Sequence, residues 1–563
     1  MPILPERARH ALIKHGHPLA AGASCVLALC VAVAPALAHG SDQGRGFDQG
    51  RGYHVNHGAL LTPGTLLLST SDYVPANITA GVTQLPPGCT GSNCTTAIAG
   101  GAYPYVFNND QADGSFGVTS PIYLDELTPW GQTFGRIAVP TRDMVTSFSS
   151  KPELALNLST NGQDVTFMGY EAPVDGIDVS NSSTPGVIDS TNPVPSSYYR
   201  VVADLGRDGR FNSFTRTNAY SGNNGRAAIL NNAANVIYTA GNAGNGSNPQ
   251  PDGIILGAGA QILSRSFLPE WWQSPGTPTP VGSFNITQLP ANKKPDKIGK
   301  DTNFRGLTVY NNVVYLTKGS GSNGINTVYF IDTTGKACPG TGVGVPQPGA
   351  QLPTSGLNYD ASLLQAEGVT PYNMCVLAGF PTTLAKNATT SFPFGLWFAN
   401  PTTLYVADEG DGTTTYSSAV GTYTDAAAQT TAGLQKWVFN STAGQWRLAY
   451  TLQSGLNLGQ PYTVSGYPTG TNSVTGLPWS PATDGLRNIT GQVSRDGTAT
   501  IWGITSTVSG SGDQGADPNK LVSITDRLSA TSPGSERFQT LKTARSGEVL
   551  RGVLFAPGTY SAR

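Results

Sequence analysis

Four arginines stand at the same place in four similar apolar phrases of the chain. Each precedes a short run that is typical of a β-strand, and together they are Arg226, Arg305, Arg487 and Arg551. If these strands lie at equivalent positions around one axis, the four guanidinium groups form a ring, which we call the arginine collar. Guanidinium groups are planar donors that suit a carboxylate, a sulfate or a phosphate. The spacing therefore predicts an anion site at one mouth of a channel, on a face that we call the collar face.

The same arginines have a purely structural interpretation. The strands that follow them return to the collar face and end in polar or charged residues, which are Asp72, Tyr73, Glu171, Lys318, Asp408 and Glu409. A buried charge needs a partner whether or not a ligand binds, so an internal ring of salt bridges and a ligand-facing collar both stay open. In either case Asp72, Tyr73 and Lys318 share the face with the collar, and we place them in the predicted ligand site.

A second candidate site is the acidic loop Asp408-Glu-Gly-Asp411. It offers carboxylate oxygens in a glycine-rich segment, and these are the ligands that calcium prefers. Two other acidic segments, Asp208-Gly209 and Asp496-Gly497, fall where a hairpin needs a tight turn. Asp-Gly is a common tight-turn pair, so we interpret both as structural.

Histidine narrows the possible chemistry. All six histidines lie at or before position 57, and the last two are His54 and His57. Because no histidine follows His57, the body of the chain cannot contain a Ser-His-Asp triad, a histidine zinc site or a histidine general base.

The elements that must position these residues are predicted to be the strands of an all-β, six-bladed propeller. The clearest unit is the stretch from Phe392 to Gly412, with predicted strands at 395–399 and 403–407. Its inner-strand phrase recurs in six units, which predicts six blades. Seven blades are the alternative, if residues 269–300 form a further blade. The C-terminal strand 550–556 completes the first unit, which starts at strand 65–73, so we expect the ring to close by pairing of the terminal strands.

The phrase Pro393-Phe-Gly-Leu-Trp-Phe, followed by Leu404-Tyr-Val-Ala-Asp408, resembles the blade phrase of NHL-type and lactonase-like six-bladed propellers. That group ranges from binding scaffolds to calcium-dependent hydrolases, so the resemblance implies a fold more than a function. It also implies where calcium would lie, in the channel between carboxylate and asparagine side chains. By position these are Glu171, Asp408 and Asn488, with Asp72 as a base. The full ligand set is not matched, and an arginine collar repels a cation.

The N-terminal 38 residues have the features of a signal peptide. Arg7, Arg9 and Lys14 precede an apolar run at 19–34, and Ala36-Leu37-Ala38 fits a cleavage site. We expect a flexible linker at 39–59 and the propeller at 60–563, and no further apolar segment is long enough to span a membrane. The sequence thus predicts a secreted or periplasmic protein.

Composition agrees with export. Charged residues make up 12% of the chain, whereas Gly (69) and Pro (40) are abundant, as in a turn-rich extracellular β protein. A net charge of −2 argues against a nucleic-acid partner. Four cysteines follow the signal, and we predict the pairs Cys89–Cys94 and Cys338–Cys375, although four cysteines allow three pairings.

Aromatic residues in the insertions leave two interpretations open. Trp271, Trp272 and Trp479 are either exposed platforms for a sugar ring or anchors that hold a loop to the body. We predict a monomeric propeller that binds a small-molecule or carbohydrate ligand, anionic or sugar-like, on its collar face. There are two alternatives: a calcium-dependent hydrolase of a lactone or phosphoester, and a structural or adhesive propeller. Calcium is the one cofactor that we consider, and it is implied only by the resemblance.

Overall fold

The computed structural model describes residues 60–85, 94–97, 100, 103–104, 117–148, 154–186, 188, 194–242, 259–266, 281–283, 303–320, 324–338, 341–355, 374–385, 387, 391–511 and 515–559. All of them belong to one compact unit, residues 53–563. The described residues are almost all β, and no helix among them is long and apolar enough to cross a membrane.

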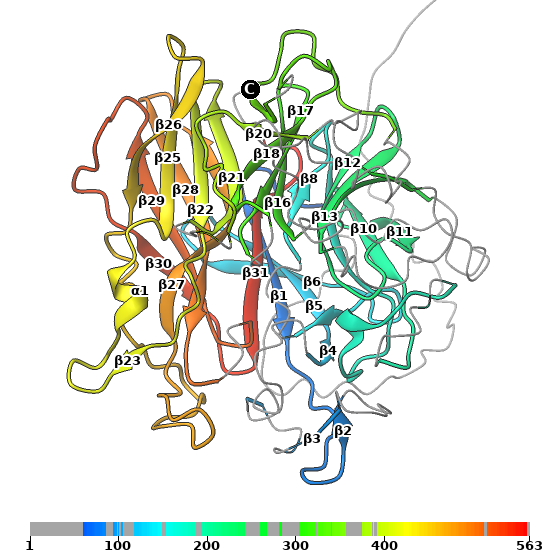
Figure 1. The fold of residues 1–563 in the computed structure, drawn as a ribbon. Helices are drawn as coiled ribbons and strands as arrows, with labels where there is room; N and C mark the ends of the chain where they lie inside the picture. The colour runs from blue at the N-terminus through cyan, green and yellow to red at the C-terminus, as the bar shows by residue number, and fades with distance from the viewer. Residues whose placement is uncertain are drawn as a thin grey trace, which may run out of the picture. The chain divides into compact units, whose positions relative to one another are not determined.

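Six antiparallel sheets form the six blades of a propeller (Figure 1). Blade 1 consists of β31 (Glu548–Phe555), β1 (Leu66–Asp72), β5 (Ile122–Leu127) and β6 (Thr133–Ala138). Blade 2 consists of β8 (Asn157–Leu158), β9 (Asp164–Tyr170), β10 (Arg200–Gly206) and β11 (Phe211–Thr217). Blade 3 consists of β12 (Gly225–Asn231), β13 (Val236–Gly241), β14 (Ala260–Ser264) and β15 (Val281–Ser283).

The remaining three blades follow in chain order. Blade 4 consists of β16 (Phe304–Tyr310), β17 (Val313–Lys318), β18 (Thr327–Ile331), β20 (Met374–Leu377) and β19 (Val343–Gly344). Blade 5 consists of β21 (Pro393–Asn400), β22 (Thr403–Asp408), β25 (Gly433–Asn440) and β26 (Gln445–Leu452). Blade 6 consists of β27 (Ala482–Val493), β28 (Thr498–Val508), β29 (Lys520–Arg527) and β30 (Gln539–Thr543).

Smaller elements lie in the connections. They are β2 (Gln84–Leu85), β3 (Thr95–Thr96), β4 (Thr119–Ser120), β7 (Thr146–Ser147), the 3-10 helix η2 (Val179–Asn181), β23 (Tyr416–Ser417), β24 (Thr422–Tyr423) and α1 (Thr424–Ala428). In Figure 1, β2, β3, β4, β23 and α1 all lie in the lower half of the view.

The ring closes through the two ends of the described chain, as the sequence predicts. β31 pairs with β1 along its length, from Leu66 opposite Phe555 to Asp72 opposite Glu548, and Figure 1 shows the two strands side by side. Inner strands of successive blades contact one another, from β12 through β16, β21 and β27 to β31. The prediction of six blades with terminal-strand closure is therefore confirmed.

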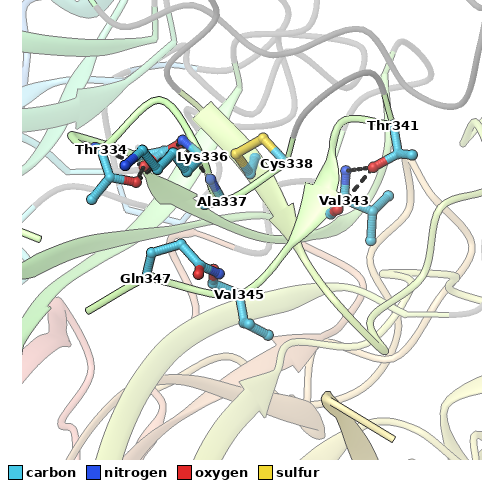
Figure 2. The surroundings of a disulfide bond; sticks show 10 residues. Thr334, Lys336, Ala337, Cys338, Thr341, Val343, Val345 and Gln347 are labelled. Carbon is cyan, nitrogen blue, oxygen red and sulfur yellow. Dashed lines mark hydrogen bonds between the residues drawn. A yellow bond between two sulfur atoms is a disulfide. The ribbon is translucent and has the colours of Figure 1, made fainter. Parts of the chain in front are cut away.

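Blade 4 has five strands, one more than the other blades. β20 pairs with β18, with Tyr329 opposite Val376, and β19 runs parallel to β20. No local pattern in the sequence indicates this pairing, because β18 and β20 lie on either side of an insertion. A disulfide between Cys338 and Cys375 joins the two sides of that insertion, as predicted, and Figure 2 shows its surroundings.

The core lies between neighbouring blades. β22 illustrates the reason, since every residue from Thr403 to Asp408 is buried. Its two faces pack against different blades: Leu404 and Val406 join the cluster shared by blades 3, 4 and 5, whereas Tyr405 and Ala407 join the cluster shared by blades 5 and 6. A strand that is buried on both faces has a continuous run of apolar residues in its sequence. For this reason the strands of blade 5 were the easiest to predict.

The two faces of the propeller differ in their connections. On the collar face the inner strands begin and the second strands end, and this face carries the long connections 409–432 and 453–481. The opposite face carries tight turns such as 232–235, 311–312, 401–402 and 494–497, and the long connection between β18 and β20 also begins there. Binding residues tend to lie on long loops held by a rigid scaffold, so the collar face is where a site is expected.

Candidate anion site at the channel mouth

A bulge places the collar arginines at the start of the inner strands. In blade 4 the pairing jumps from Phe304 opposite Lys318 to Leu307 opposite Leu316, so that Arg305 and Gly306 face a single residue. Similar register breaks fall at Arg226, at Arg487 and at Arg551. A bulge bends its strand and re-aims its side chains, so each of these arginines leaves the regular alternation of its strand.

A hydroxyl opposite the bulge joins each of two blades to the next. In blade 4, Thr317 accepts a hydrogen bond from Gly306 N at 2.8 Å and donates one to Phe394 O at 2.5 Å. In blade 1, Ser69 accepts from Gly552 N at 2.7 Å and donates to Leu154 O at 2.8 Å. The arrangement satisfies the backbone groups that the bulge would otherwise leave without a partner.

The charged centre of the site joins three blades. Glu409 follows β22 in blade 5, and its Oε2 accepts a hydrogen bond from Arg487 Nε of blade 6 at 3.1 Å. Its Oε1 lies 3.7 Å from Arg305 Nη2 of blade 4. Phe394 occupies the collar position of blade 5, and the Arg305 guanidinium lies over its ring, 5.7 Å from the ring centroid. Blade 5 thus has an aromatic residue where four other blades have an arginine, and the Phe394 ring contacts the guanidinium group of Arg305.

The two arginines share one carboxylate. Arg305 and Arg487 are 7% and 4% exposed, and Glu409 is their one carboxylate partner in the described part of the chain. Burial and the neighbouring Arg487 charge both lower the pKa of Arg305, whereas Glu409 opposes the shift. Arg305 Nη2 donates to Ser320 Oγ, whereas Arg305 Nε makes no hydrogen bond to any described residue. Two buried guanidinium groups therefore share the carboxylate of Glu409.

Arg226 and Arg551 lie at the equivalent positions and contact neutral oxygens. Arg226 donates to Phe304 O at 3.0 Å, to Asn224 Oδ1 at 3.3 Å and to Asn303 Oδ1. Arg551 donates through Nη2 to Phe148 O. Both are buried and both hold the connections of neighbouring blades, in addition to any role toward a ligand.

Asp408 fixes the loop that carries Glu409. Its Oδ2 accepts from Phe392 N at 2.8 Å, Ser391 Oγ at 3.0 Å and Gln435 Nε2 at 3.0 Å, and its Oδ1 accepts from Gly410 N at 3.0 Å. Complete burial raises the pKa of Asp408 to about 6 against the effect of these donors. The side chain thus acts as an acceptor for the loop backbone.

Asp484 also belongs to this loop network, and the sequence analysis did not identify it. It accepts from Gln429 Nε2 at 2.6 Å and from Gly412 N at 2.9 Å, so it holds the far end of the same loop. Burial raises its pKa to about 7. The hydrogen bonds of Asp484 join residues that are far apart in the sequence. The one local indication of its place in the site is its position three residues before Arg487.

The other residues of the predicted ligand site have partners within the protein. Lys318 is fully buried and donates to Ser320 O at 2.9 Å and to Asn326 Oδ1 at 3.2 Å. Asp72 lies 4.0 Å from Arg136 Nη1. Tyr73 packs in an aromatic cluster, 5.4 Å from the Phe148 ring, and burial raises its pKa to about 12.

The three residues assigned to calcium by resemblance do not fit such an ion. Glu171 forms an ion pair with Arg216, and burial raises its pKa. Asn488 donates from Nδ2 to Arg551 O at 2.8 Å, and the oxygens of Asp408 face four donors. Among the described residues, no group of three or more His, Cys, Asp or Glu side chains is arranged to hold a metal. We therefore derive no calcium-dependent step.

Several expectations concern residues outside the described ranges. These are His54, His57, Cys89, Trp271 and Trp272, together with the signal and linker segments. Cys94 lies within the described part of the chain, but the predicted bond to Cys89 does not. Trp479 is 2% exposed and its ring lies 6.5 Å from that of Tyr467. It is therefore an anchor of its loop and not an exposed platform.

Comparisons with known proteins found no matching family model and no match among curated proteins. Solved structures gave matches at low similarity. A chain of a nidogen/laminin complex is 10% identical over 79% of this chain and 98% of its own, with a TM-score of 0.33.

Two bacterial proteins are similar to the same degree. A Lactobacillus plantarum protein is 9% identical, with 86% and 83% of the two chains covered and a TM-score of 0.32. Lignostilbene dioxygenase from Pseudomonas brassicacearum is 10% identical, with 89% and 94% covered and a TM-score of 0.32. The six-bladed assignment rests on the strand pairing described above, and these likenesses add no argument to it.

Proposed function

We propose that this protein is an exported propeller that binds an anionic ligand at the channel mouth. One observation carries the proposal: the buried guanidinium groups of Arg305 and Arg487 share the single carboxylate of Glu409. Buried charges need compensation, because desolvation of an ion is unfavourable by several kcal/mol. An external anion would supply the second negative charge. Arg226 and Arg551 would extend the positive surface around it.

The proposal also covers the segments and assignments that the sequence predicts. Residues 1–38 would be removed as a signal peptide, 39–59 would be a linker, and the mature protein would be a monomer of the NHL or lactonase-like group. The disulfide between Cys338 and Cys375 supports an oxidising compartment, since such bonds persist in secreted and periplasmic proteins. Asp72, Tyr73 and Lys318 would then stabilise the collar face and would not contact the ligand.

Anion-dependent thermal stability tests the proposal. We would measure the melting temperature of the purified protein in sodium glucuronate and in sodium sulfate, with sodium chloride at matched ionic strength. A ligand that binds only the folded state stabilises it by RT ln(1 + [L]/Kd), which is about 2.7 kcal/mol at about 100 times Kd. We expect a saturable rise above the chloride baseline.

Three variants assign the effect to the collar. Arg305→Gln and Arg487→Gln should abolish the rise, whereas Arg142→Gln should keep it, because the side chain of Arg142 is 85% exposed and lies outside the site. A large fall in melting temperature for Arg305→Gln with the anion effect intact would instead support a purely internal salt-bridge ring.

A further inference from the structure

We infer that the ligand of the channel mouth is an organic carboxylate, and that the Glu409 side chain occupies the carboxylate position until the ligand arrives. This inference rests on the proposed function and names the ligand class for the same site. The Glu409 side chain would be an internal competitor, which an incoming carboxylate displaces.

The first support is the geometry around Glu409. Its two carboxylate oxygens face two different blades, with Oε2 3.1 Å from Arg487 Nε and Oε1 3.7 Å from Arg305 Nη2. The site therefore already encloses a planar carboxylate between two guanidinium groups. The ring of Phe394 lies against the Arg305 guanidinium and bounds the site with a flat apolar surface.

The second support is that Glu409 satisfies the arginines incompletely. It receives one hydrogen bond from Arg487, through Nε, and its contact with Arg305 at 3.7 Å is an ion pair beyond hydrogen-bond distance. The Nη atoms of Arg487 donate no hydrogen bond to a described residue, and neither does Arg305 Nε. A free carboxylate can take the bidentate geometry that guanidinium favours, so it gains hydrogen bonds that the tethered side chain does not make.

The third support is that the backbone around Glu409 is held by hydrogen bonds that do not involve the Glu409 side chain. The Glu409 N–H donates to Phe392 O at 3.0 Å, and the Glu409 carbonyl accepts from Ser506 Oγ at 2.5 Å. The neighbouring Asp408 holds the loop through four hydrogen bonds. With the backbone fixed on both sides, displacement of Glu409 leaves the loop and the strand ends where they are.

The test removes the internal competitor. Glu409→Gln keeps the size of the side chain but removes its charge, so two buried guanidinium groups would have no carboxylate partner in the described part of the chain. We expect sodium acetate to bind this variant about tenfold more tightly than the wild type, measured as the Kd of the saturable rise in melting temperature. Sodium sulfate at matched ionic strength is the comparison, and its Kd should change by a smaller factor because a tetrahedral anion fits the planar position less well.

The outcomes separate this inference from the proposed function. If wild-type protein binds anions through Arg487 and the acetate Kd of Glu409→Gln is unchanged or weaker, the internal-competitor inference is wrong and the proposed function stands. If sulfate gains more than acetate, the carboxylate class is wrong. If neither protein binds any of the anions, both the function and the inference are wrong.

A second variant covers failure of Glu409→Gln to fold. Glu409→Asp keeps the charge but shortens the side chain by one methylene, so that its carboxylate reaches both arginines less well. We expect acetate to bind this variant about threefold more tightly than the wild type. An acetate Kd equal to that of the wild type in Glu409→Asp would overturn the inference. Asp208→Asn, in an exposed turn on the opposite face, is the control and should leave the acetate Kd unchanged.

Discussion

At the scale of single residues, two buried acids predict a pH dependence of stability. Asp408 and Asp484 hold the two ends of the loop that carries Glu409, and burial raises their pKa values to about 6 and about 7. Both therefore bind a proton more tightly in the folded than in the unfolded protein. A protonated carboxyl still accepts hydrogen bonds from the loop backbone, so the loop can stay in place in either state.

This difference predicts that stability falls as pH rises. Unfolded Asp484 releases its proton near pH 3.8, whereas the folded protein keeps it up to about pH 7. Within this window the unfolded state binds fewer protons, so Asp484 should lower the free energy of unfolding by up to about 1.4 kcal/mol per pH unit. The stabilising contribution is fully present below pH 3.8 and is lost as pH rises through about 7.

Urea unfolding across this range, on the wild type and on Asp484→Asn, checks the prediction. Other groups contribute to the pH dependence of the wild type, so the difference between the two slopes is the informative quantity. We expect a shallower fall with pH for Asp484→Asn. Parallel curves would show that Asp484 has an ordinary pKa in the folded protein.

At the scale of elements, bulged inner strands allow the blades to approach one another closely. Gly306, Gly395 and Gly552 each follow the collar position of their blade, and each lies against a backbone carbonyl of the next blade. A Cβ on Gly395 would lie 2.6 Å from Arg487 O, nearer than side chains come to backbone atoms. Glycine is required at these positions by the close approach of two backbones.

Gly306→Ala should therefore destabilise the protein strongly. The added Cβ would overlap Phe394 O and the Thr317 hydroxyl, which joins blades 4 and 5. Backbone atoms cannot move aside without displacing a blade, so we expect a loss of at least about 3 kcal/mol in the free energy of unfolding by urea.

Gly135→Ala is the matched control for this substitution. Gly135 lies on β6, and an added Cβ would meet only the Glu126 side chain, at 3.3 Å. We expect a change within about 0.5 kcal/mol. Equal losses for the two variants would show that close packing at the channel mouth is not the cause.

At the scale of the whole molecule, the pairing of β31 with β1 turns six sheets into a ring. This closure joins residues from opposite ends of the described chain and removes two strand edges that would otherwise be open. The C-terminal strand also carries Arg551, whose Nη2 donates to Phe148 O in the connection between blades 1 and 2.

Val553→Asp tests the closure. Val553 is 1% exposed and pairs with Leu68, so a carboxylate there would be buried without a counter-charge among its apolar neighbours. We expect a loss of more than about 4 kcal/mol in the free energy of unfolding and the appearance of oligomers in size-exclusion chromatography, because the β1 edge becomes available for pairing.

Leu448→Asp separates this effect from the cost of a hydrophobic-to-acidic change in general. Leu448 lies on the outer strand β26 and is 41% exposed. The variant should stay monomeric and lose less than about 1 kcal/mol. A monomeric, stable Val553→Asp protein would mean that the ring does not depend on the terminal strands.

The sequence by itself determined the fold class, the blade count and the terminal closure. These properties follow from local patterns: apolar runs of strand length, turn residues between them, and one phrase repeated around the ring. A phrase such as Leu404-Tyr-Val-Ala-Asp408 encodes a strand buried on both sides whatever its neighbours are. The pair Cys338–Cys375 was predictable because few cysteines were available.

Only the tertiary structure decided the partners of the charged residues. The sequence named Glu409 as one of several possible partners, but its position between Arg305 and Arg487 depends on three blades meeting at the channel mouth. The same holds for Asp484 and for the outer strand β20, which pair across long stretches of chain. Strand formation depends on near neighbours in the sequence, whereas charge pairing depends on which segments the closed ring brings together, and that distance information is absent from a linear pattern.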